Sequence, residues 1–153
     1  MDLQKIKNSL YRVIETLIAD KQANLFLFGD RGEFNDLCYE VVTKMKEKYP
    51  YIQRIYFRSK YEEISALYEK YLLTLYERTE FSKQVHNAGV ASYIKRNEAM
   101  IDACDVIVVY YDESYVSSVK SRRKKSGTAL AVNYAKRKGK KVINTLEDDN
   151  RNG

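Results

Sequence analysis

Residues 24–50, "NLFLFGDRGEFNDLCYEVVTKMKEKYP", contain the pattern that decides the fold. The continuous apolar run over 24–28 predicts a buried strand that ends at Gly29. After a polar turn, apolar residues recur at helical spacing along one face of 34–49, and the predicted helix stops at Pro50. A buried strand that turns through glycine into an amphipathic helix indicates an α/β protein.

The same alternation continues on both sides of this stretch. Helical spacing predicts further helices over 2–22, 91–104 and about 127–138, and apolar runs predict strands over 52–57, 105–111 and 141–144. We expect segment 60–90 to contain a helix and an irregular connection. Continuous apolar strands between helices predict a three-layer Rossmann-like α/β sandwich with a mainly parallel sheet of about four to five strands.

Length and composition predict one domain over residues 1–153. The 44% apolar content is enough for a globular core. No run approaches the roughly 18–20 apolar residues that cross a bilayer, and the charged N-terminal segment does not resemble a secretory signal. Cys38 and Cys104 lie in apolar patterns, which is typical of buried thiols in a reducing compartment. We therefore expect a cytoplasmic protein that does not bind membranes.

The net charge of +6 is unevenly distributed. From Ser114 to Leu146 the chain has 10 Lys/Arg residues and no Asp/Glu. A local concentration of positive charge favours a single anionic site over a general nucleic-acid-binding surface. The alternative is a basic face that is simply exposed to solvent.

The loop after the first strand is the first candidate site. Gly29 and Gly32 let the backbone turn tightly and approach a ligand, and Arg31 can pair with a phosphate or carboxylate. Glu33 stands where a carboxylate can cap free N–H groups or accept from ribose hydroxyls. With Asp30, these residues are predicted to contact ligand. The alternative is a plain strand-to-helix turn with a capping acid, since the loop matches neither common phosphate-binding motif.

The start of the helix at 127–138 is the second candidate site. Ser126 or Thr128 can cap the helix, while Gly127 exposes the backbone N–H groups that attract an anion. Lys125 and its basic neighbours strengthen that field, so a phosphate is the expected ligand. The alternative is an ordinary Ser/Thr cap.

Two other features allow more than one interpretation. Arg96 and Asn97, on the predicted helix 91–104, can either reach a ligand or brace a loop. The tyrosines of segment 60–90 suggest packing against another subunit, a lid over a flat ring, or filling of the core. His86 is the only histidine and belongs to no catalytic motif, and no group of residues has the spacing of metal ligands.

Three stretches together resemble the SLOG superfamily of Rossmann-like nucleotide-binding domains. They are "FLFGDRGEF", "RNEAMIDACDVIVVYYDE" and "KSGTALAVNYAKRKGKKVIN", and the resemblance covers roughly residues 24–144. The chain is most similar to the bacterial YpsA-like branch, which is related to lysine-decarboxylase-like phosphoribohydrolases. The resemblance implies an oligomeric protein and a ligand such as a nucleoside phosphate, NAD or an ADP-ribose-like signal. The family's glycine-bearing loops correspond to Gly29, Gly32 and 126–128.

The chain departs from the hydrolases of this superfamily at one important position. Those enzymes have a glutamate three residues after the threonine of the Gly-Thr motif, and this chain has Ala131 there. A methyl group cannot stabilise an oxocarbenium charge or act as a nucleophile. Glu33 is the one carboxylate that we consider as a substitute, from the other loop. This departure argues against hydrolysis and leaves binding intact.

The sequence thus favours a sensor or sequestering protein for a nucleotide-derived ligand. We expect phosphate at Gly127 and Thr128, and base or ribose near Phe34, Arg96 and Asn97. The alternative is a hydrolase of N-glycosidic bonds that uses Glu33. A nucleic-acid-binding module that uses "KSRRKK" and "KRKGKK" ranks third.

Overall fold

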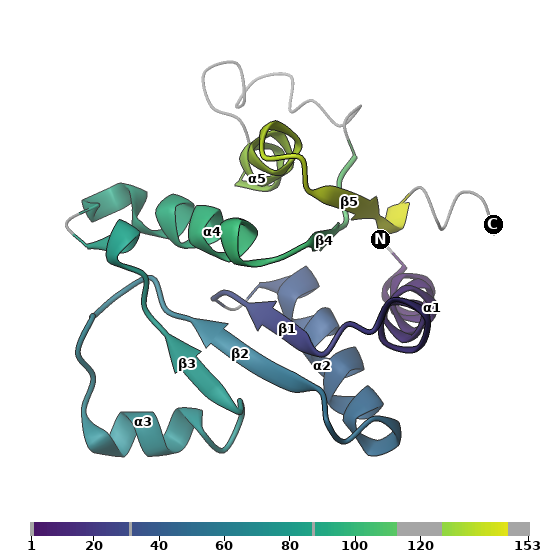
Figure 1. The fold of residues 1–153 in the computed structure, drawn as a ribbon, viewed down its shortest axis with the longest axis horizontal. Coiled ribbons are helices and arrows are strands. Elements are labelled where there is room, and N and C mark those ends of the chain that lie inside the picture. The colour runs from purple at the N-terminus through teal and green to yellow at the C-terminus, as the bar shows by residue number, and fades with distance from the viewer. Residues whose placement is uncertain (1, 31, 87, 113–126, 147–153) are drawn as a thin grey trace.

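The computed structural model describes residues 2–30, 32–86, 88–112 and 127–146. The elements along the chain are α1 (Leu3–Lys21), β1 (Leu25–Phe28), α2 (Glu33–Lys48), β2 (Gln53–Phe57), α3 (Ala66–Leu72), β3 (Arg78–Glu80), two short 3₁₀ turns (Lys83–Val85 and Gly89–Ala91), α4 (Ser92–Ala103), β4 (Val106–Val109), α5 (Gly127–Arg137) and β5 (Lys141–Asn144) (Figure 1). The helices and strands that the sequence predicts are confirmed. The short strand β3, inside segment 60–90, was not predicted.

The first three strands form one parallel sheet in the order β1-β2-β3. Leu25 lies opposite Gln53, and Phe28 lies opposite Tyr56. Because the strands are parallel, the residues that follow β1 and β2 leave the sheet at the same edge. The loop after Phe28 and the loop after Phe57 therefore leave the sheet as neighbours.

The last two strands form a second parallel pair, β4 with β5. The side chain of Asn144 continues the hydrogen bonding of this pair beyond the end of the strands. Its Oδ1 accepts from the backbone N–H of Tyr111 at 3.1 Å, and its Nδ2 donates to the Tyr111 carbonyl at 2.6 Å. The predicted α/β class with parallel strands is confirmed. The hydrogen bonds, however, define sheets of three and two strands, whereas the sequence predicts one sheet of four to five.

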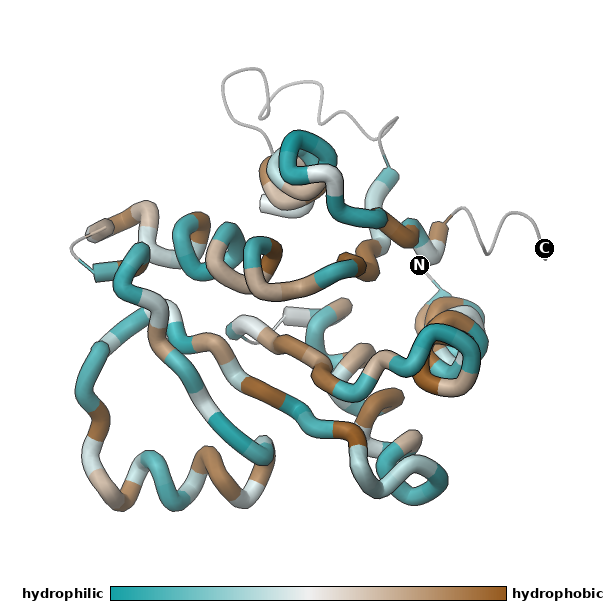
Figure 2. Tube along the Cα trace, in the orientation of Figure 1, coloured by the Kyte–Doolittle hydropathy of each residue, from teal (hydrophilic) through white to brown (hydrophobic). Residues whose placement is uncertain are grey.

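The core is built mainly from α1, α2 and the strands between them. Apolar side chains at helical spacing on α1 are buried, because they pack against α2 and the end of β1. The buried cluster contains Ile6, Leu10, Ile14, Ile18, Phe28, Val41, Val42 and Ile52. Figure 2 shows the apolar stretches concentrated along the strands, with helices of mixed character around them. Away from this cluster, helix α4 packs against helix α5.

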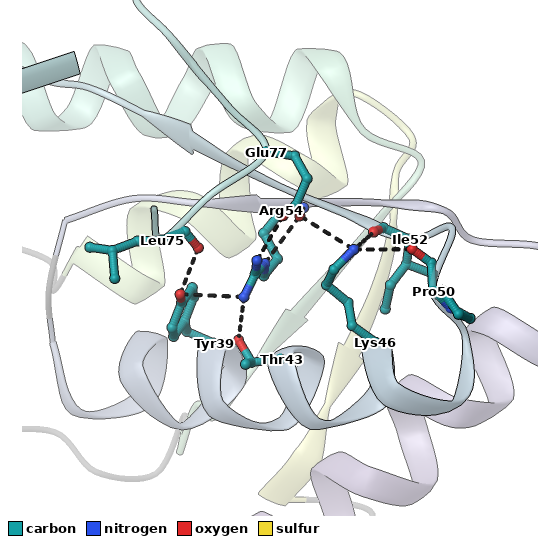
Figure 3. Close-up of polar contacts among 8 residues, drawn as sticks. All are labelled: Tyr39, Thr43, Lys46, Pro50, Ile52, Arg54, Leu75 and Glu77. Atoms are coloured by element: carbon teal, nitrogen blue, oxygen red, sulfur yellow. Dashed lines mark hydrogen bonds and ion pairs between the residues drawn. The ribbon is translucent and has the colours of Figure 1, made fainter. Parts of the chain in front are cut away.

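A polar network fixes β3 to β2 and α2 (Figure 3). The Arg54 guanidinium donates twice to the Glu77 carboxylate, at 3.1 and 2.7 Å, and Glu77 also accepts from the Arg54 backbone N–H at 2.7 Å. Arg54 reaches α2 through Thr43 Oγ1 at 3.1 Å, and Lys46 Nζ lies 3.7 Å from Glu77. Planar, two-point bonding of this kind is among the stronger ion pairs in proteins. The network therefore joins the residue before β3 to both β2 and α2.

None of the helices in the described part of the chain combines the length and the apolar character needed to cross a membrane.

Candidate functional site

The candidate site is built around Asp30, directly after β1. One carboxylate oxygen accepts from Tyr56 Oη at 2.8 Å, and the other accepts from Ser59 Oγ at 2.7 Å. Arg96 Nη1 of α4 lies 3.1 Å from the second oxygen. Asp30 therefore connects the loop after β1, the end of β2 and α4 at a single point.

Arg96 is buried, with 6% of its surface exposed, and it supports the glycine loop. Its Nε donates to Asn97 Oδ1 at 2.9 Å, and its guanidinium packs on the backbone of Gly29. A Cβ at Gly29 would lie 2.9 Å from Arg96 Cζ, closer than real contacts allow. An alanine at this position would therefore displace the end of the Arg96 side chain. Of the two roles predicted for Arg96 and Asn97, the geometry is that of bracing, and direct ligand contact stays a prediction.

The Asp30 carboxylate is held in its charged form. Burial opposes ionisation, but the hydrogen bonds from Ser59 and Tyr56 and the charge of Arg96 outweigh it, so the pKa of Asp30 lies below its ordinary value. Burial and the bond to Asp30 raise the pKa of Tyr56, which keeps that hydroxyl a donor. The site therefore contains a permanent anion with donors arranged around it.

The start of α2 already carries negative charge. The cap residue is Gly32, which has no side chain to accept a hydrogen bond from the first turn. Glu33 and Asp36 stand in that turn. Two carboxylates near the positive end of a helix dipole satisfy it electrostatically and repel a further anion. Glu33 is exposed. The ring of Phe34 lies 6.3 Å from the ring of Tyr110, the residue that directly follows β4.

The start of α5 has the opposite character. Its first turn, Gly127 to Leu130, contains no acidic residue. Gly127 is exposed, Thr128 is partly buried, and a Cβ at Gly127 would meet no atom within 4 Å. Arg31, Lys125 and Ser126, also predicted as site residues, lie outside the described part of the chain.

Two residues of the Asp30 cluster were missed by sequence reasoning. Tyr56 and Ser59 come from the end of β2, and no glycine marks that position. The available signal was topological, since polar residues that follow a strand parallel to β1 reach the same edge of the sheet.

The tyrosines of segment 60–90 divide into two groups. Tyr76 fills the core, with its ring 5.2 Å from those of Tyr39 and Tyr56. Tyr61, Tyr68 and Tyr71 are exposed. Core filling is therefore correct for Tyr76, and the exposed group is available for the other predicted roles.

Parallel strands with a glycine loop braced at their carboxyl edge define an α/β protein with a candidate ligand site at the loops. The family model YpsA, described as the YspA SLOG family, matches residues 1–149, so the chain belongs to this family. It is also similar to the uncharacterized SPbeta prophage-derived protein YoqJ of Bacillus subtilis (strain 168), with 29% identity over 149 residues, 87% of this chain and 81% of YoqJ. The resemblance found in the sequence is confirmed. Membership of the family suggests a nucleotide-related Rossmann-like protein.

Proposed function

We propose that the protein binds a nucleotide-derived ligand and acts as a sensor or sequestering protein in the cytoplasm. The ligand lies along the edge where β1 and β4 end, with its phosphate at the start of α5. Nucleoside phosphates, NAD and ADP-ribose-like molecules share the required chemistry, which is a phosphate attached to ribose. The proposal draws on the family membership and on the geometry of the two loops.

The observation that carries this proposal is the contact between Phe34 and Tyr110. Phe34 follows the first glycine loop, and Tyr110 follows β4, so the contact brings the end of β4 next to the start of α2. Ligands of open α/β proteins bind at the carboxyl ends of the strands. The contact therefore supports a single site shared by both loops.

The charges at the two helix starts support one orientation of the ligand. Glu33 and Asp36 in the first turn of α2 disfavour a phosphate there. The first turn of α5 has no acid and begins with Gly127, so the positive end of its helix dipole suits a phosphate. The ribose then lies beside Gly29 and Phe34, where hydroxyl groups can reach Asp30 or Glu33.

A thermal-shift measurement with AMP, NAD, ADP-ribose and ribose 5-phosphate tests the proposal. At a ligand concentration 100-fold above a micromolar Kd, linkage adds about 2.7 kcal/mol to the free energy of unfolding, which raises Tm by several degrees. Thr128→Val, which removes one hydroxyl and keeps the shape, is expected to reduce the shift. Thr74→Val, at an exposed position after α3, is the matched control. No shift with any of the four compounds at millimolar concentration overturns the proposal.

A further inference from the structure

A cavity of about 350 Å³ lies beside Asp30, between the end of β2 and α3. Its volume falls in the range of small-molecule sites in proteins. The residues that shape its chemistry are Asp30, Tyr56, Arg58, Lys60, Tyr61 and Tyr68. Three aromatic rings, two cations and one carboxylate thus surround a space that adjoins the proposed ribose position.

Arg58 contributes a buried donor that is not satisfied. The residue is 9% exposed, and its two terminal nitrogens donate to Thr79 Oγ1 at 3.2 Å and to the Glu62 carbonyl at 3.0 Å. Its Nε is buried and has no hydrogen-bond partner among the described residues. A buried N–H of a cation that loses water without a replacement is unfavourable. The guanidinium is held by its two terminal hydrogen bonds, and Arg58 adds a fixed positive charge to the wall of the cavity.

Two tyrosines, Tyr61 and Tyr68, add flat apolar surfaces to the same cavity. Tyr61 is 74% exposed and has a φ of 51°, an uncommon conformation for a bulky residue. Tyr68, on α3, is 41% exposed. Exposed aromatic rings beside cationic donors are the usual means of recognising a heterocyclic base, because every base has a face to stack and acceptors at its edge.

We propose that this cavity binds the heterocyclic base of the ligand. The base stacks on Tyr61 or Tyr68, next to the positive charges of Arg58 and Lys60. The inference rests on the proposed function, because the phosphate remains at the start of α5. The sequence predicts the base near Phe34, and this inference places it instead at the end of β2.

Titration calorimetry on the full chain tests the proposal with AMP, GMP and ribose 5-phosphate, the last of which lacks a base. The nucleotide that the wild type binds more tightly, AMP or GMP, serves as the probe. In the double variant Tyr61→Ala/Tyr68→Ala, the affinity for this nucleotide is expected to fall about tenfold or more, because stacking is lost. The affinity for ribose 5-phosphate is expected to stay unchanged. Leu67→Ala, at an 80% exposed position of the same helix that does not line the cavity, is the control and leaves all three affinities as they are.

The outcomes separate the two proposals. If the wild type binds AMP or GMP and the double variant binds them equally well, the base does not occupy this cavity, while the proposed function stands. If the double variant loses ribose 5-phosphate binding to the same degree, the cavity does not recognise the base, and the inference is also overturned. If the wild type binds none of the three, the proposed function itself fails. Circular dichroism of each variant establishes that it is folded.

Discussion

Two arginine–carboxylate pairs stand at opposite ends of β2 and illustrate two uses of the same chemistry. Arg54, near the start of the strand, bonds Glu77 through two guanidinium nitrogens and its backbone N–H. Arg96 meets Asp30, just beyond the other end, at one oxygen only, and two hydroxyls share that carboxylate. The first pair joins two strands, and the second positions a glycine loop next to a cavity. The Arg54–Glu77 pair, which links strands, and the Asp30 cluster, which borders the candidate site, thus lie one strand length apart.

The largest expected effect comes from breaking the first pair. Arg54→Met leaves Glu77 without its main partner, and the two side chains are 13% and 29% exposed, so the pair is only partly accessible to water. We expect the free energy of unfolding to fall by about 2–3 kcal/mol, as measured by urea denaturation, because a partly buried charge loses its compensation. Nucleotide affinity is expected to stay unchanged. Arg78→Met, which breaks the exposed pair with Glu80, is the control and should cost less than about 0.5 kcal/mol. Equal effects of the two variants would contradict the distinction.

A smaller effect is expected at the second pair. In Gly29→Ala, the new methyl group collides with the Arg96 guanidinium, which must move away from Asp30. We expect a loss of about 1 kcal/mol in the free energy of unfolding, together with a reduced thermal shift by nucleotides. Asn24→Ala, at the exposed residue before β1, is the control and is expected to change neither quantity. If both variants behave alike, Arg96 does not depend on the glycine.

The smallest expected effect is on the pH dependence of the free energy of unfolding. The pKa values of both Asp30 and Glu77 are lowered in the folded protein, against the opposing effect of burial, by their hydrogen bonds and by Arg96 and Arg54 respectively. Each group therefore stabilises the fold above its ordinary carboxyl pKa of about 4, and this contribution is lost as the pH falls through the lower, folded value. We expect stability to decline from pH 5 to pH 3, and less steeply in Glu77→Gln and Asp30→Asn. Denaturation curves at several pH values measure the slopes, and parallel slopes for all three proteins would refute the assignment.

The fold was largely predictable because its signals are local. The helical spacing of α1 and α2 and the apolar runs of β1, β2, β4 and β5 appear within short windows of sequence. The strand β3 could not be found in this way, because "RTE" is polar and three residues long, and it is fixed by Glu77 bonding Arg54, 23 residues away. The division into two sheets likewise depends on hydrogen bonds between distant segments.

The candidate site was predictable where glycine marked it. Gly29 and Asp30 follow a clear strand, and Arg96 with Asn97 stood out as polar residues on a half-apolar helix face. The bond network among Asp30, Tyr56 and Ser59 was missed, because nothing local in "YFRS" distinguishes it from any strand end. Finding it required knowing that β2 is parallel to β1, which only the assembled sheet reveals.

Asn144 has a consequence for the chemical ageing of the protein. Its amide acts as donor and acceptor toward the same residue, Tyr111, so it replaces a peptide group that a longer strand would supply. Deamidation would convert this side chain to a carboxylate of the same size that can only accept. The Tyr111 carbonyl would then face an oxygen, so an isosteric change of one atom would separate the tips of β4 and β5.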